Sequence, residues 1–241
     1  MKRIQMKGEE FVRKILQGER DFSYIVLEEN FNLFSHEGFN EIQIYLSNQN
    51  LKENPINLYY SDLIGLCARE LYFPYTKGNS ANFTKTNLSK AVLENSNFEG
   101  TRFNRADIKG ATWNKANLNN TNFFSSDLRT ASFKQAKLYR AYLWKADCRS
   151  ADFSNANLEY ANLGWANLQG ACLEGADIKG ANFLRINLSE TSLKSVKNLD
   201  SALNLETADI LETIVNKKEK RILEKALKRR EFFISESLSS L

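Results

Sequence analysis

Few residues in this chain of 241 have the type and spacing that catalysis or metal binding needs. His36 is the single histidine, so a Ser-His-Asp arrangement or a histidine metal cluster has only one candidate. Cys67, Cys148 and Cys172 form no CxxC pair, and neither GxGxxG nor GxxxxGK[ST] occurs. We therefore expect a protein that is not an enzyme and holds neither a metal nor a cofactor.

The sequence has more residues of the kind that bind other proteins than residues of the kind that catalyse reactions. Residues 139–145, YRAYLWK, bring three large aromatic side chains together with Arg140 and Lys145. Aromatic residues and arginine are the usual anchors of protein interfaces. The position of these side chains depends on the repeat in which they lie.

Residues 81–195 repeat with a period of five through 115 residues, or 23 pentads. The third residue of each pentad is Leu, Phe or Ile except at Trp113 and Cys148, and the first is Ala, Ser or Thr except at Ile186. This period matches neither the 3.6-residue stripe of a helix nor a sustained alternation of two. It predicts a solenoid whose chain turns a corner in every pentad, with the first and third residues inside.

The pattern resembles A(N/D)LXX, the repeat of the pentapeptide-repeat family, for example in residues 116–120 and 156–160. The resemblance covers about half of the chain and implies an all-β solenoid, a right-handed quadrilateral β-helix with four pentads per coil. Its coils stack at about 4.8 Å in a rod roughly 28 Å long. Because only a small residue fits beside each inward Leu or Phe, we expect a bulged coil at Trp113 and strain or a tapering end at Ile186.

We expect helical caps on both ends of the rod. Phe11, Val12 and Ile15 lie on one side of a short helix, and apolar residues from Leu211 to Phe233 recur at helical spacing, with an interruption at 217–221. The predicted parts are an N-terminal capping helix, interrupted coils with loop insertions, the regular β-helix and a C-terminal helical cap, at 1–19, 20–80, 81–195 and 196–241. Two alternatives stay open: an independent domain at 20–80, and a homodimer contact through the C-terminal helix.

Four pentads per coil place residues twenty apart on the same wall of the rod. In this projection the outward positions gather aromatic and basic side chains on one wall and on the edge of the preceding wall. We interpret this face as the binding surface for an unidentified partner protein. The alternative is that the chain's own loops or C-terminal helix cover it. The residues expected to bind the partner are Phe124, Tyr139, Arg140, Tyr142, Trp144, Lys145, Tyr160, Trp165 and Arg185.

A second arrangement indicates a different ligand. Lys109, Arg129 and Arg149 are twenty apart and stack on another wall, where they could follow a phosphate backbone. The repeat region carries 15 Lys and Arg against 10 Asp and Glu, which is a mild positive excess. Nucleic-acid binding is therefore the alternative to a solvated face.

The family resemblance adds a further alternative. Some pentapeptide-repeat proteins resemble duplex DNA and bind gyrase, which requires a strongly negative rod, and the positive repeat region disfavours this function. Residues 18–22, GERDF, are similar to cyanobacterial members of the family, some of which regulate heterocyst differentiation by protein contact. With no secretory segment and no long apolar run, we expect a cytoplasmic protein that does not bind membranes.

Overall fold

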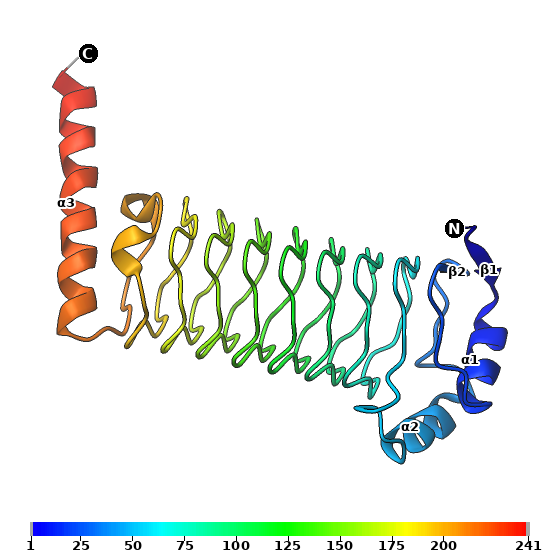
Figure 1. Cartoon of the computed structure of the whole chain (residues 1–241). Coiled ribbons are helices and arrows are strands. Elements are labelled where there is room, and N and C mark those ends of the chain that lie inside the picture. The colour runs from blue at the N-terminus through cyan, green and yellow to red at the C-terminus, as the bar shows by residue number, and fades with distance from the viewer. Residues whose placement is uncertain (1, 240–241) are drawn as a thin grey trace.

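The computed structural model describes residues 2–239 as a rod of stacked coils with helices at both ends (Figure 1). Short elements precede the regular coils, and one long helix follows them. In chain order these are β1 (Ile4–Met6), α1 (Gly8–Leu16), β2 (Ile25–Leu27), α2 (Phe39–Ser47), the short 3-10 helices η1 (Leu199–Ser201) and η2 (Leu205–Thr207), and α3 (Lys217–Ser239).

The coils have four sides and twenty residues each. Parallel bridges join residues twenty apart without a break from Asn57 with Lys77 to Asp177 with Lys197, and the bridged positions are five residues apart along the chain. We name the four walls of the rod A, B, C and D. They contain pentads 96–100, 101–105, 106–110 and 111–115 respectively, with every pentad that lies a multiple of twenty residues away.

Each pentad turns its corner through backbone hydrogen bonds and a left-handed residue. In the wall B pentad that begins at Thr121, the second residue, Asn122, accepts a hydrogen bond through its side chain from the N–H of Phe124, at 2.9 Å. The fifth residue, Ser125, has φ 54°, a conformation that costs a residue with a Cβ some energy. The N–H of Phe123 donates to the carbonyl of Tyr142 in the next coil, at 2.7 Å. The corner therefore repeats because each coil hydrogen-bonds to the next.

The interior is filled by the first and third residues, and Trp113 belongs to it. Its side chain is fully buried, and its ring packs edge-on against Phe98 and Phe103, with ring centroids 5.3 Å apart in both pairs. The expected bulge at Trp113 is wrong, because Thr112 keeps its bridges to both neighbouring coils. Edge-to-face packing lets the larger ring fit without displacing the backbone.

Regular stacking begins at Asn57, ahead of the position where the sequence pattern becomes regular. The reason lies in exchanged side-chain sizes. Leu66 and Leu71 are buried at first positions that elsewhere hold a small residue, whereas Ala68 and Gly78 occupy third positions that elsewhere hold a large one. These residues are still buried, but the amino-acid pattern that reveals the repeat is lost.

The first coil contains an insertion. Asp21 bridges Asn57, so that these partners lie 36 residues apart rather than twenty, and the additional residues contain α2. Helix α1 buries Phe11, Val12 and Ile15 and contacts α2. The parallel pair of β1 and β2 lies at the same end of the rod (Figure 1).

The last coil has more residues than the regular twenty, and α3 follows it. Asn187 bridges Asp209, 22 residues away, directly after the buried Ile186. Ile214 bridges Ser192, so the expectation that one helical pattern begins at Leu211 is wrong. Residues 217–221, the expected interruption, instead form the start of α3, which contacts η1 and η2. Phe233, assigned to the same pattern, lies outside the residues whose side chains are described.

Gly78 offers a direct test of the exchanged core. A Cβ at this position would lie 2.3 Å from Cε1 of Phe98, whose ring occupies the space that a larger residue would fill. Gly78→Leu should therefore overpack the core and lower the free energy of unfolding by about 1–3 kcal/mol. Adding Phe98→Leu should restore much of that loss, as measured by chemical denaturation. Simple addition of the two single-variant losses would contradict this packing.

Candidate protein-binding surface

The structure brings the predicted aromatic and basic residues to wall B and the adjoining edge of wall A. Tyr142 and Trp165 on wall B are 37% and 46% exposed, and Tyr160 on wall A is 46% exposed. We call the nine predicted residues the aromatic surface. Three further residues of wall B flank or line it, namely Arg102, Arg105 and Leu184.

The rings of the aromatic surface pack mainly along the rod axis. Phe124 stacks on Tyr142 of the next coil, with centroids 6.4 Å apart, and the Arg185 guanidinium lies 4.9 Å from the centroid of the Trp165 ring. At the wall A edge, Tyr139 and Tyr160 make an edge-to-face pair at 5.8 Å. The guanidinium of Arg140 lies 5.1 Å from the ring centroid of the same Tyr139. These contacts hold long side chains in defined positions, which lowers the entropy that a partner must remove.

Trp144 is positioned by a residue that the sequence analysis did not single out. A Cβ at Gly164 would lie 2.4 Å from Cζ3 of Trp144, so the indole lies against the glycine backbone in the next coil. The ring is half-buried and Gly164 is buried beneath it. The detectable signal is glycine at the fourth position of wall B, twenty residues after a tryptophan. The Trp144 ring therefore lies against the backbone of the wall, beside the more exposed Trp165.

The C-terminal helix lies away from the aromatic surface. Helix α3 contacts η1 and η2 and stands beyond the last coil, while α1 and α2 lie at the opposite end (Figure 1). Lys145 and Arg140 are exposed, as are the three aromatic residues whose accessible fractions are given above. The described residues thus leave the predicted surface open to solvent.

The predicted nucleic-acid column lies on wall C, where aspartates accompany it. Arg149 makes a two-point contact with Asp147, with Nη2 to Oδ2 at 2.6 Å and Nε to Oδ1 at 2.9 Å. Arg129 binds Asp127 in the same way and also approaches Asp147 at 3.7 Å. These guanidiniums are held by carboxylates of their own wall, which leaves little unbalanced charge for phosphates.

The ion pairs of wall C also shift the pKa of a carboxyl group, that of Asp127. Partial burial favours a higher pKa for Asp127, but the hydrogen bonds from the side chain and backbone N–H of Arg129, with the positive charges of Arg129 and Lys109, outweigh it. The pKa of Asp127 is therefore lowered. Because the pKa of Asp127 is lower in the folded chain, its ionised carboxylate stabilises the folded chain at neutral pH.

His36 and the cysteines have structural positions. His36 accepts a hydrogen bond at Nδ1 from the N–H of Gly38 and therefore donates from Nε2 to Glu9, at 2.9 Å. Cys148 is an inward residue of the core, and burial raises the pKa of its thiol. Within residues 2–239, the side chains that are described include no cluster of three or more His, Cys, Asp or Glu that could hold a metal.

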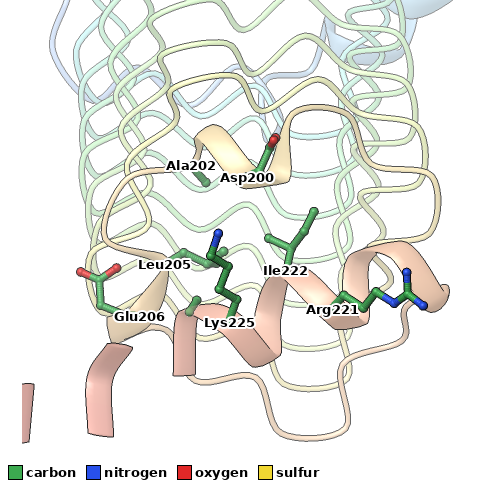
Figure 2. Close-up of a pocket in the computed structure, with 8 residues that line it drawn as sticks. Asp200, Ala202, Leu205, Glu206, Arg221, Ile222 and Lys225 are labelled. Carbon is green, nitrogen blue, oxygen red and sulfur yellow. The ribbon is translucent and has the colours of Figure 1, made fainter. Parts of the chain in front are cut away.

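A pocket of about 360 Å³ lies where α3 meets the last coil (Figure 2). Ile222 points from α3 toward the coil, and Leu205 of η2 lies near it. Asp200, Glu206, Arg221 and Lys225 give the lining charges of both signs. The pocket is thus part of the junction between helix and rod. It adjoins one end of the aromatic surface, because the N–H of Arg185 donates to Oγ1 of Thr207 in η2, at 2.7 Å. Among the described helices, none combines the length and apolar character that crossing a bilayer requires.

Four-sided coils, an inward small and large residue in each pentad and left-handed corners define a β-helical solenoid that presents a side-chain surface. The model of the family "Pentapeptide repeats" matches 79–112, 101–138, 136–175 and 171–202, with 8 copies of the repeat. This chain belongs to the pentapeptide-repeat family, as its sequence pattern predicts. The family fold is a right-handed quadrilateral β-helix.

A solved structure shares this fold. HetL, a pentapeptide-repeat protein involved in heterocyst differentiation regulation from the cyanobacterium Nostoc, superposes with a TM-score of 0.61 at 24% identity, over 87% of this chain and 92% of HetL. Full-length QnrB1, a plasmid-mediated fluoroquinolone resistance protein, gives a TM-score of 0.46 at 15% identity over 71% of this chain and 87% of QnrB1. No match was found among curated proteins. At 24% identity the similarity to HetL concerns the fold alone.

The lowered pKa of Asp127 generates a prediction about acid stability. A carboxyl whose pKa falls on folding contributes stability above its ordinary pKa of 3.8 and loses that contribution as the pH drops through the folded value. Asp127→Asn should therefore be less stable than the unmodified chain at pH 7, and the difference should shrink as the pH falls below 3.8. Urea midpoints at several pH values provide the measurement. A difference that does not depend on pH would show that the ion pair is not its cause.

Proposed function

We propose that this chain is a non-enzymatic scaffold or regulator that binds another protein through the aromatic surface. The observation that carries the proposal is the exposure of Tyr142, Tyr160 and Trp165 side by side with arginines on one region of a regular rod. Large exposed aromatics are costly to leave in water, and buried aromatics with arginine supply most of the energy at protein interfaces.

The coil architecture is suited to binding another protein, because it fixes the positions of the outward side chains. The outward positions of the rod are fixed by hydrogen bonds between coils, such as those of Phe123 and Tyr142, and not by mobile loops. A preformed surface loses little conformational entropy on binding. The proposal therefore places specificity in the side chains at the second, fourth and fifth positions of pentads on walls A and B.

We further propose that the helices at the two ends act as caps. Phe11 and Ile15 of α1 and Leu223 of α3 are almost fully buried, at 1%, 0% and 4% exposure. Capping covers the open edge of a solenoid, which would otherwise pair with other chains. Compared with the predicted division, the caps narrow to α1 and α3, because the bridges extend the coils from Asp21 to Ile214.

The alternative functions have less support. A mimic of duplex DNA that inhibits gyrase needs a strongly negative rod, whereas the repeats carry a positive excess. A nucleic-acid site at Lys109, Arg129 and Arg149 would have to break the contacts of two arginines with Asp127 and Asp147. HetL, which is involved in heterocyst differentiation regulation, has a similar fold, and this similarity supports the proposal of a regulatory scaffold. Homodimerisation through α3 and a cytoplasmic location remain predictions.

Trp165 gives the sharpest test of the proposed function. Trp165→Ser removes one of the two most exposed aromatic anchors and should abolish or strongly weaken capture of a protein partner from a nuclease-treated extract of the native host. Tyr60→Ser is the matched control, because Tyr60 is 49% exposed on wall A but lies near the other end of the rod. Adding Trp144→Ser should weaken capture further. Equal capture by the Trp165 and Tyr60 variants would contradict the proposal.

A further inference from the structure

The excess of basic over acidic residues in the repeats lies on a single wall. Between 81 and 195, walls A, C and D each carry as many acidic as basic residues, with three, four and three of each kind. Wall B carries five basic residues and no acidic residue. These are Lys85, Arg102, Arg105, Lys145 and Arg185. The wall that presents most of the aromatic surface is therefore the only wall of residues 81–195 with a net charge.

The cations of wall B are exposed and unpaired by carboxylates. None of the ion pairs found among the described residues includes any of the five, whereas Arg129 and Arg149 on wall C and Lys134 on wall D each contact an aspartate. Arg185 instead lies over the Trp165 ring. Since these positive charges are not balanced within the chain, an acidic partner would meet them without first displacing an internal carboxylate.

Four of the five cations flank the aromatic centre of the wall along the rod axis. Lys85, Arg102 and Arg105 lie on the coils before Phe124, and Arg185 lies on the coil after Trp165, while Lys145 is at the middle. An apolar centre with a charged rim is the usual anatomy of a protein interface. A single strand of nucleic acid needs a more continuous track of positive charge.

The orientation of the rings also favours a protein ligand. The Phe124 and Tyr142 rings form an offset stack with each other, and the Arg185 guanidinium lies over one face of the Trp165 ring. Nucleobases bind by stacking on open ring faces. Rings that are stacked along the rod are better suited to pack against aliphatic and aromatic side chains of a polypeptide.

We propose that the partner contacts wall B through an acidic polypeptide segment, with apolar residues in its centre and Asp or Glu toward both ends. This inference rests on the proposed function and specifies the partner's chemistry. From Arg102 to Asn182 the wall crosses four coil steps, or about 19 Å, which an extended segment of roughly six residues spans. Its central side chains would contact Trp144 and Trp165, and its carboxylates would meet Arg102, Arg105 and Arg185.

The experiment selects peptides from a displayed random library on the unmodified chain and classifies each binder by whether it still binds the Trp165→Ser variant. Binders that depend on Trp165 should have a net negative charge. The triple variant Arg102→Glu, Arg105→Glu, Arg185→Glu should weaken their binding roughly tenfold or more. The matched control Lys109→Glu, Lys115→Glu, Lys194→Glu makes the same change in net charge on walls C and D and should have a much smaller effect.

The outcomes separate the two proposals. Trp165-dependent binders that are neutral or basic, or that respond equally to both triple variants, would overturn the acidic segment and leave the protein-binding surface standing. A library without any Trp165-dependent binder would contradict both. Tighter binding of a fluorescent thirty-nucleotide oligo(dT) than of the selected peptides, lost in the wall B triple variant, would instead assign this wall to single-stranded nucleic acid.

Discussion

The structure depends on a steric constraint in the narrow interior of the coil. Each pentad places one large and one small side chain inside, and a hydrogen-bonded corner with a left-handed residue follows them. Because this unit is the same on four walls, residues twenty apart are brought into register. The outward side chains do not take part in this interior packing. They can therefore vary by wall, and the chain uses this freedom to give one wall aromatic residues and positive charge.

The sequence was sufficient to predict the family, the inward residues and the projection onto walls, because a strict period specifies all three. It was insufficient where a different physical solution fills the same space. Leu66 with Ala68 exchanges large and small residues, and Phe98 fills the space above Gly78, so the coils before 81 show no simple pattern. Ile214 fits a helical spacing as well as a coil position, and only its bridge to Ser192 distinguishes them.

The sequence predicted which residues lie on the candidate surface, but it did not predict the contacts that those residues make. Spacing alone placed Trp144 and Trp165 on one wall, but it did not show that Trp144 lies against Gly164. Nor did it show which arginines are paired: Arg149 shares its wall with a carboxylate partner, whereas Arg185 stacks on a ring. The difference between a balanced wall and an unbalanced one therefore separates the two basic groups that looked alike in sequence.

Site-specific photo-crosslinking around one coil tests the central claim, that one side of the rod binds the partner, most directly. A photoreactive phenylalanine derivative is placed in turn at Asn120, Ser125, Thr130 and Gln135, the fifth positions of walls A to D, since Tyr160 and Trp165 show that such positions accept an aromatic residue. After illumination in an extract of the native host, the account predicts a protein adduct from Ser125 and Asn120 only. Equal adducts from all four positions, or adducts only from Thr130 and Gln135, would contradict it.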